Sequence, residues 1–205
     1  MNSFERLKQY TTYCPFAASA KVEHQLSWDP NLSFLENVQA HSVTLREFTR
    51  FAQERDYHGF VSRVLIGPAA KSFETTRVTF REYLYGLAKF DEDCAQNLAQ
   101  DKVNLNWQFS FNNLRMFLNV FSPCYSNQHS KYIASEDSIY IFFQPEYSFD
   151  LCGSKPLNRT ITLSIRDRFD EHGQAYDGEL IDRRIEAYIY MFPEKLGDPP
   201  VVWWE

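Results

Sequence analysis

The sequence predicts an α+β fold in which helices flank a central antiparallel sheet, all within a single domain over residues 1–205. Three observations lead to this prediction. Helical spacing dominates residues 30–55 and 76–90, β-rich runs fill the centre from 107 to 143, and no repeat or low-complexity linker separates the two parts. A length of 205 residues fits one large domain or two small ones, and a chain this long buries roughly 70 % of its unfolded surface, so it needs no disulfide or metal to fold.

The first half of the chain is predicted to be mainly helical. Ser3–Tyr10 forms a short candidate helix, and Asp29-Pro30 predicts a helix start that leads into two helices, or one broken helix, across 30–55. Residues 59–66 predict a strand that ends at Gly67-Pro68. Thr76–Phe90 is the clearest helix, because its apolar residues recur every three or four positions.

The centre of the chain is predicted to be an antiparallel meander. Its three strand candidates are Trp107–Phe111, where aromatic and polar residues alternate, then Arg115–Phe121 and Ser138–Phe143. Asn112-Asn113 lies between the first two and favours a tight hairpin turn.

The last third mixes signals. Thr160–Phe169 fits either a strand, by its β-branched residues, or a helix, by its apolar spacing. Glu179–Phe192 predicts one helix that Pro193 ends, and Val201–Trp204 predicts a short apolar tail docked on the domain.

Composition excludes several classes of protein. The formal net charge is −6 and no long basic run occurs, so nucleic acid is an improbable partner. No apolar run approaches the ~20 residues of a membrane helix, and the first residues do not resemble a signal peptide, so we expect no membrane partner and a cytoplasmic location. The four cysteines are widely spaced, which favours free thiols.

Chemistry-bearing side chains are densest between the second and third central strands. This stretch contains Cys124, Tyr125, His129 and Lys131 in a predicted loop, where a rigid scaffold often displays reactive groups. His129 is a candidate iron ligand or proton carrier. The alternative is an ordinary surface-loop histidine. No standard catalytic motif occurs, and none of the five histidines lies three or four residues from another.

Four further positions have both a functional and a structural interpretation. Cys14, before Pro15, is a candidate haem thiolate or a small buried side chain. Glu146 follows the third strand and is suited to hold a cationic substrate, or else lies in a solvated turn. Arg166 and Arg168 suit carboxylates or haem propionates, or form an exposed salt-bridge face.

Taken in order, these stretches resemble the YqcI/YcgG-like family. The matching segments are Cys14-Pro-Phe-Ala-Ala-Ser-Ala20, Phe80–Asp91, Phe109–Phe111, Phe117–Pro123, His129–Tyr132, Ile141–Asp150, Ile165–Arg168 and Tyr176–Gly178. The characterised members are haem-dependent N-hydroxylases that act on arginine-type substrates. The resemblance covers the chain from about Tyr13 to Gly178 and implies a common fold.

The chain departs from the hydroxylase members at two positions. Those members carry a histidine where this chain has Ser122, and another where it has Glu146. If either histidine ligates iron in those enzymes, this chain lacks that ligand. Cys14 matches the family pattern, whereas His129 does not.

The resemblance implies a haem-dependent, oxygenase-like enzyme that hydroxylates a nitrogen of a small amine, guanidine or amino acid. Haem b is the expected cofactor. The expected partners are a small-molecule substrate and an external electron donor, and the sequence leaves open whether the protein forms a homodimer. The expected roles are iron ligation by Cys14 or His129, catalysis by Glu146 and Tyr125, and cofactor binding by Lys131, Arg166, Arg168, Phe117 and Phe143. Phe109 would join the last two in walling the site.

Two other hypotheses stay open. The first is a non-catalytic module on the same fold that has lost haem ligation and binds a small molecule or a protein. The second is a metal-free enzyme that uses the loop of Cys124, Tyr125 and His129 for covalent chemistry, with the cysteine as nucleophile.

Overall fold

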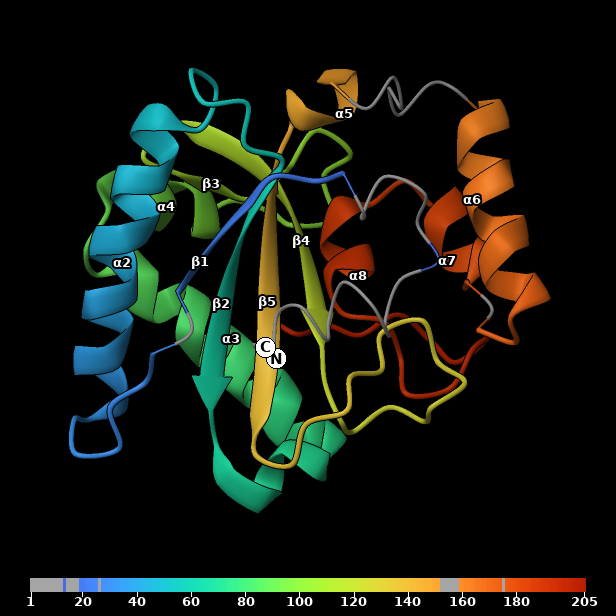
Figure 1. Cartoon of the computed structure of the whole chain (residues 1–205), viewed down its shortest axis with the longest axis horizontal. Coiled ribbons are helices and arrows are strands. Elements are labelled where there is room, and N and C mark those ends of the chain that lie inside the picture. Colours follow the sequence, from blue (N-terminus) through green and yellow to red (C-terminus); the bar gives the residue numbers. More distant parts are fainter. Residues whose placement is uncertain (1–12, 14–18, 26, 152–158, 175) are drawn as a thin grey trace.

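A computed structural model of the chain describes residues 13, 19–25, 27–151, 159–174 and 176–205. It has a five-stranded sheet with the order β1-β2-β5-β4-β3, flanked by helices, which confirms the predicted α+β class (Figure 1). The strands are β1 (Val22–Gln25), β2 (Gly59–Leu65), β3 (Ser110–Phe111), β4 (Leu114–Phe121) and β5 (Ser138–Pro145). The helices are α2 (Phe34–Phe51), the 3₁₀ helix η1 (Gly67–Lys71), α3 (Phe73–Ala88), α4 (Glu92–Leu98), α5 (Ser148–Leu151), α6 (Arg159–Glu171), α7 (Gly178–Asp182) and α8 (Glu186–Tyr190).

The predicted meander is confirmed. Strands β3, β4 and β5 pair antiparallel in sequence order, and β2 pairs antiparallel with β5. Asn112 and Asn113 form the turn between β3 and β4, with φ values of 51° and 62°. Two successive residues with positive φ characterise the type I′ hairpin turn, and asparagine tolerates that conformation better than most residues. The preceding strand is shorter than predicted, because only Ser110 and Phe111 pair with β4.

One pair of strands is parallel, which the sequence did not predict. Strand β1 runs parallel to β2, and α2 forms the crossover between them. Residues 30–55 contain one helix rather than two. It begins after Ser33, not at Asp29-Pro30, because Ser33 and Glu36 form a reciprocal capping box.

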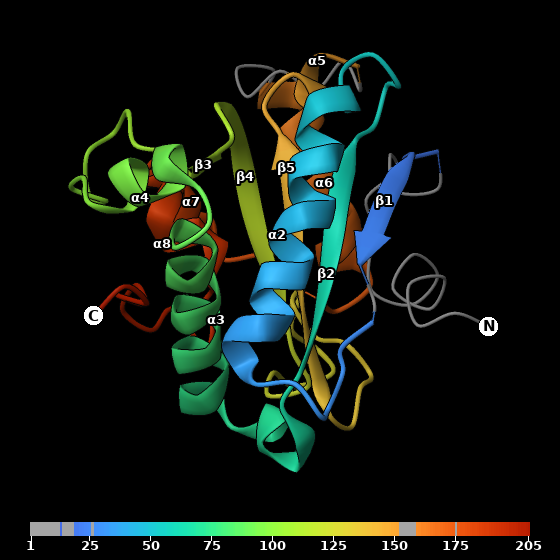
Figure 2. The same ribbon diagram turned by 90° about the vertical axis from the view of Figure 1, so that its left-hand side faces the viewer.

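The main core lies between one face of the sheet and helices α2 and α3 (Figure 2). It contains aromatic and aliphatic side chains of β2, β4 and β5 that alternate along the strands, such as Phe60, Leu118 and Phe143. The predicted docking of the C-terminal tail is confirmed. Trp203 is fully buried and its Nε1 donates to the carbonyl of Ala187 over 2.7 Å.

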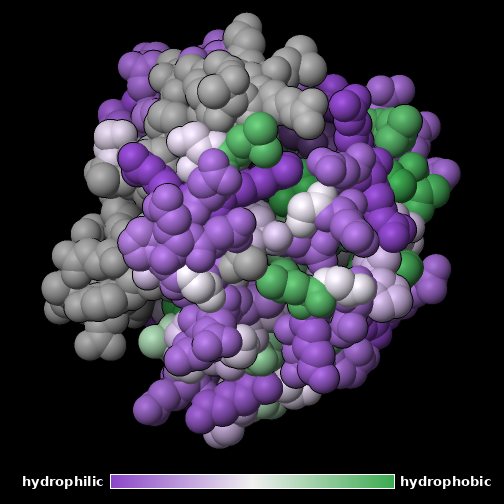
Figure 3. Space-filling model, turned by 90° about the vertical axis from the view of Figure 1, so that its right-hand side faces the viewer, coloured by the Kyte–Doolittle hydropathy of each residue, from purple (hydrophilic) through white to green (hydrophobic). Residues whose placement is uncertain are grey.

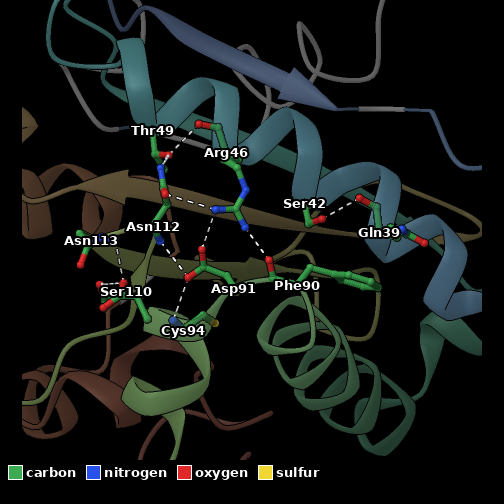
Figure 4. A network of polar contacts seen from close by, with 11 residues as sticks. Gln39, Ser42, Arg46, Thr49, Phe90, Asp91, Cys94, Ser110, Asn112 and Asn113 are labelled. Atoms are coloured by element: carbon green, nitrogen blue, oxygen red, sulfur yellow. Dashed lines mark hydrogen bonds and ion pairs between the residues drawn. The ribbon is translucent and has the colours of Figure 1, made fainter.

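A polar network joins α2, α4 and the β3–β4 hairpin (Figure 4). The carboxylate of Asp91 caps α4 by accepting from the N–H of Cys94 over 2.9 Å and also accepts from the N–H of Asn112 over 3.0 Å. Its other oxygen lies 3.1 Å from the guanidinium of Arg46 on α2. One buried carboxylate therefore fixes three elements relative to one another.

The described residues from 159 to the end of the chain contain the helices α6, α7 and α8. Residues 160–169, which the sequence left ambiguous, lie within α6. The predicted helix over 179–192 is interrupted, since Arg184 has a φ of 58° and separates α7 from α8. The predicted helix Ser3–Tyr10 lies outside the described residues. Among the described residues, none of the helices has the length and apolar content that crossing a bilayer requires.

Candidate functional site

The loop between β4 and β5 brings together three of the predicted site residues. The loop returns beside β4, because the N–H of Ser122 donates to the carbonyl of Lys131 over 3.0 Å. The ring of Tyr125 then stacks on that of His129, with centroids 4.2 Å apart and an interplanar angle of 10°. All three side chains, those of Tyr125, His129 and Lys131, are buried.

Lys131 is enclosed by an amide and three aromatic rings. Its Nζ donates to Oδ1 of Asn119. It lies 4.7 Å from the ring centroid of Phe192, and 5.4 Å from those of Phe121 and Tyr176. We call Asn119, Phe121, Tyr176 and Phe192 the Lys131 cage. Burial lowers the pKa of Lys131 to about 7, although the ring faces and the amide oxygen stabilise the ammonium.

The protonation state of His129 follows from its contacts. Burial, and to a smaller extent the positive charge of Lys131, lowers the pKa of His129 to about 4, against weaker opposing effects of the Pro193 carbonyl and Asp177. The imidazole is therefore neutral at pH 7. Its Nδ1 accepts from the backbone N–H of Lys131 over 3.0 Å, so the proton resides on Nε2. Within the described part of the chain, this buried Nε2 makes no hydrogen bond of normal geometry, and the carbonyl of Pro193 provides the weak interaction that favours its proton.

Tyr125 has a structural contact that explains its burial. Its hydroxyl donates to the carbonyl of Phe192 over 2.8 Å, which ties the loop to the segment after α8. Burial, with the charges of Cys124 and Glu194 acting in the same direction, raises the pKa of Tyr125 well above its usual value. The phenol therefore stays protonated and anchors the loop.

The two arginines of α6 differ in their surroundings. Arg168 is exposed. Arg166 is partly buried, and its guanidinium lies 3.9 Å from the carboxylate of Asp182. Its Nε is buried and, among the described residues, lacks a hydrogen-bond partner. A buried donor without an acceptor is costly, so either a residue outside the described ranges or a bound anionic group is expected to satisfy it.

The predicted aromatic wall is divided between two sides of the sheet. Phe143 is fully buried in the main core, where its ring lies 5.9 Å from that of Phe109 and 6.2 Å from that of Phe60. Phe117 points to the opposite face and contacts Phe149, with ring centroids 6.2 Å apart. Phe117 and Phe143 therefore do not line one site.

Ser122 and Glu146, the positions where the resemblance predicts histidines in hydroxylases, lie at opposite ends of β4. The hydroxyl of Ser122 contacts that of Thr76 on α3 over 2.9 Å, at the end of the strand. The N–H of Glu146 donates to the carbonyl of Arg115, near its start. The Glu146 carboxylate is 57 % exposed and lies 3.8 Å from Nε of Arg115. Seven residues of strand separate the two ends by roughly 23 Å, so the two positions cannot share one ligand.

Cys14 and residues 15–18 lie outside the described residues. Tyr13, which precedes Cys14 in the chain, stacks on His172 with centroids 3.8 Å apart and contacts the edge of Phe169 at 5.7 Å. Phe169 in turn lies 4.7 Å from Tyr176, a member of the Lys131 cage. A continuous row of aromatic rings thus joins Tyr13 to the cage.

Sequence reasoning missed one acidic residue with an unusual environment. Glu186, on α8, has a buried Oε2 without a hydrogen-bond partner among the described residues. Burial raises the pKa of Glu186 to about 7. The positive charge of Arg115 opposes this rise, and the negative charge of Glu146 adds to it. The sequence placed Glu186 on an unbroken helix and gave no signal of this burial.

Comparison with known proteins identifies the family. The profile of the YqcI/YcgG family matches residues 5–189, which is most of the chain. The chain belongs to the YqcI/YcgG family. Neither the curated proteins nor the solved structures include a match to this YqcI/YcgG chain.

The described residues of this YqcI/YcgG protein fit haem in part. Arg166 fits, because its free buried Nε is suited to a propionate. His129 does not fit as an axial ligand, since its Nδ1 lone pair is engaged and its Nε2 carries the proton. Lys131 does not fit as a propionate partner, because the cage encloses its ammonium. Within the described ranges, no three metal-binding side chains converge.

Proposed function

We propose that this chain is a haem-dependent, oxygenase-like enzyme that hydroxylates a nitrogen of a small amine, guanidine or amino acid. Membership of the YqcI/YcgG family supports this proposal, together with the family-like element Cys14-Pro-Phe-Ala. Haem b would be the cofactor, and it would supply oxygen activation with electrons from an external donor. The protein would bind and orient the substrate.

The hydrogen bonding of His129 favours Cys14 as the iron ligand. A neutral imidazole offers one lone pair, and Lys131 N–H already occupies that of His129. A cysteine thiolate is an established haem ligand and favours O–O cleavage. Of the two candidates, Cys14 also matches the family pattern.

The main structural support for the proposal is that α6 places Arg166 near the ring of Phe169, which contacts Tyr13. Arg166 and Phe169 are three residues apart and share one face of the helix. Phe169 contacts Tyr13, the residue before Cys14. Tyr13 therefore contacts the helix whose Arg166 has a buried Nε without a partner among the described residues, which would suit a propionate or a substrate carboxylate. Glu146, exposed beside Arg115, would steer the cationic end of a substrate.

A non-catalytic binding protein is the second candidate function. The closed cage around Lys131, and the presence of Ser122 and Glu146 where hydroxylases carry histidine, favour it. On this alternative the chain retains the fold and has lost haem ligation.

Haem binding separates the two candidates. The protein is purified from cells fed a haem precursor, and its visible spectrum is recorded before and after reduction and addition of carbon monoxide. The enzyme proposal predicts a Soret band that shifts with carbon monoxide, and a weaker retention of haem in Arg166→Met than in the exposed control Arg183→Met. A protein that is folded and stays colourless in haem titrations would support the binding-protein alternative instead.

A further inference from the structure

A polar pocket of about 360 Å³ lies at the end of the molecule that carries α4 and the β3–β4 hairpin. Its walls come from α4, from the 100–109 loop and from the hairpin. Arg115, at the start of β4, belongs to it, whereas the Lys131 cage lies at the far end of that strand. The pocket therefore lies away from the Lys131 cage, although its Arg115 also pairs with Glu146 of the proposed substrate site, and ligand binding in it does not require haem.

Internal hydrogen bonds hold the walls of the pocket in place. Asn97 uses both ends of its amide, donating to the carbonyl of Gln108 over 2.9 Å and accepting from the N–H of Ser110 over 3.2 Å. The backbone carbonyl of Asn97 accepts from Nε1 of Trp107 over 3.0 Å. Asp93 accepts from the hydroxyl of Ser110 and from the N–H of Asn113. These contacts pre-form the pocket, which lowers the entropic cost of binding.

The charged groups of the pocket are already compensated. One carboxylate oxygen of Asp93 receives two hydrogen bonds. Arg115 lies 3.8 Å from Glu146 and donates to the carbonyl of Asn106 over 3.3 Å. The remaining charge on the wall is one carboxylate and one guanidinium, so the pocket selects neither a cation nor an anion strongly.

Side-chain amides provide the free hydrogen-bonding groups. Four of them line the pocket and make no side-chain hydrogen bond to another described residue: Gln100, Asn106, Gln108 and Asn113. Gln108 is the most informative, because it lines the pocket although the residue is only 7 % exposed. The amide atoms of Gln108 are not among the fully buried atoms that lack a partner, so solvent reaches them, and water or a ligand can satisfy them. Each amide offers a donor and an acceptor, as each hydroxyl of a polyol does.

We propose that this pocket binds a small, neutral, hydroxyl-rich molecule of the size of a monosaccharide. Its volume lies near the low end of the roughly 300–1,000 Å³ that small-molecule sites occupy. The amides of Gln100, Asn106 and Gln108 bond the ligand hydroxyls, and the part of Trp107 that lines the pocket contacts ligand C–H groups.

Three sugars that differ in charge test the proposal. Glucose, glucosamine and glucuronate are titrated in turn into ¹⁵N-labelled protein, with galactose and mannose as further neutral probes. We expect saturable shifts of the Gln100 and Gln108 side-chain amides and of the Trp107 indole with at least one neutral sugar, and weaker binding of both charged analogues. Absence of saturable binding by every neutral sugar, or roughly tenfold tighter binding of a charged analogue, would overturn it.

Substitutions in the pocket test which residues contribute to the binding of a neutral sugar. Gln108→Leu removes the buried amide and is expected to weaken binding roughly tenfold, the equivalent of one to two hydrogen bonds. Gln96→Leu is the matched control, since Gln96 lies on α4 and bonds Glu92 outside the pocket. If Gln108→Leu unfolds, the exposed Gln100→Ala replaces it, with an expected loss of roughly threefold. Equal affinity of wild type and a folded pocket variant would contradict the proposal.

Discussion

The Nδ1 atom of His129 accepts a hydrogen bond from the backbone N–H of Lys131 over 3.0 Å. This contact within one short loop decides the chemistry of the histidine. The neutral ring carries its proton on Nε2 and has no free lone pair with which to bind a metal. The loop for which the sequence suggested reactive chemistry therefore packs against the segment after α8. Of the two candidate iron ligands, Cys14 remains.

Lys131 is expected to make stability depend on alkaline pH. Its pKa falls from 10.5 in the unfolded chain to about 7 in the folded protein, so between these values only the unfolded state holds the proton. Stability then rises with pH, by at most about 1.4 kcal/mol per pH unit. We expect wild type to gain stability relative to Lys131→Met from pH 7 upward, measured by urea unfolding at pH 6, 7, 8 and 9.

The exposed Lys71→Met serves as the control for this measurement. Its stability is expected to follow that of wild type across the same pH range. Parallel pH profiles for wild type and Lys131→Met would show that the ammonium is not destabilised inside its cage, and would contradict the described burial.

Glu186 is expected to have the opposite effect on stability: between pH 4.5 and 7, its contribution to the free energy of unfolding falls as the pH rises. Its pKa rises from 4.5 to about 7 on folding, so between these values only the folded state holds the proton. The stability that this proton provides is present in full below pH 4.5 and is lost as the pH rises through 7. Glu186→Gln should therefore become more stable relative to wild type as the pH rises from 4.5 to 7. The exposed Glu194→Gln should show no such trend, and a flat difference for Glu186→Gln would count against the buried carboxyl.

Asp91 is expected to be the most sensitive polar position in the fold (Figure 4). It is 7 % exposed, caps α4 and bonds both Arg46 and the β3–β4 turn. Asp91→Ala removes a helix cap and leaves buried donors and a cation without their acceptor. We expect a loss of about 2–4 kcal/mol in the free energy of unfolding. Asp198→Ala, at an exposed position, should change it by less than about 0.5 kcal/mol. A similar small loss for Asp91→Ala would mean that the network contributes little.

Cys124 is expected to react slowly, which disfavours the metal-free covalent enzyme. Burial raises the pKa of its thiol, although hydrogen bonds to the hydroxyls of Ser122 and Thr76 oppose this effect. Nucleophilic cysteines instead have lowered pKa values. At pH 7, iodoacetamide should modify Cys124 more slowly than free glutathione, as measured by peptide mass spectrometry. Faster modification than glutathione would restore Cys124 as a candidate nucleophile.

The sequence predicted those elements whose signals are local. Strands β2, β4 and β5 and helix α3 agree with the predicted ranges within a few residues, because alternation and helical spacing are properties of neighbouring residues. The break at Arg184 was missed, since nothing in the spacing of Glu179–Phe192 marks a residue with positive φ. The parallel pairing of β1 was missed because it depends on the path of α2.

For the candidate site too, the sequence indicated only what is local in the chain. Tyr125, His129 and Lys131 are close in sequence, and their density drew attention to the loop. Their partners, however, come from distant parts of the chain. The rings of Tyr176 and Phe192 reach Lys131 only through tertiary packing. The face over α6 and α7 likewise shows mainly hydrophilic side chains with small, separate apolar patches in the coloured part of Figure 3, so its surface gives little indication of the aromatic rings beneath.

A pair of substitutions tests most directly whether Cys14 or His129 is the iron ligand. Cys14→Ala and His129→Ala are each purified from cells fed a haem precursor, and the visible spectra of the reduced, carbon monoxide-treated proteins are compared with that of wild type. We expect Cys14→Ala to lose or shift the Soret band and His129→Ala to retain it. A band that survives in Cys14→Ala and disappears in a folded His129→Ala would contradict the account.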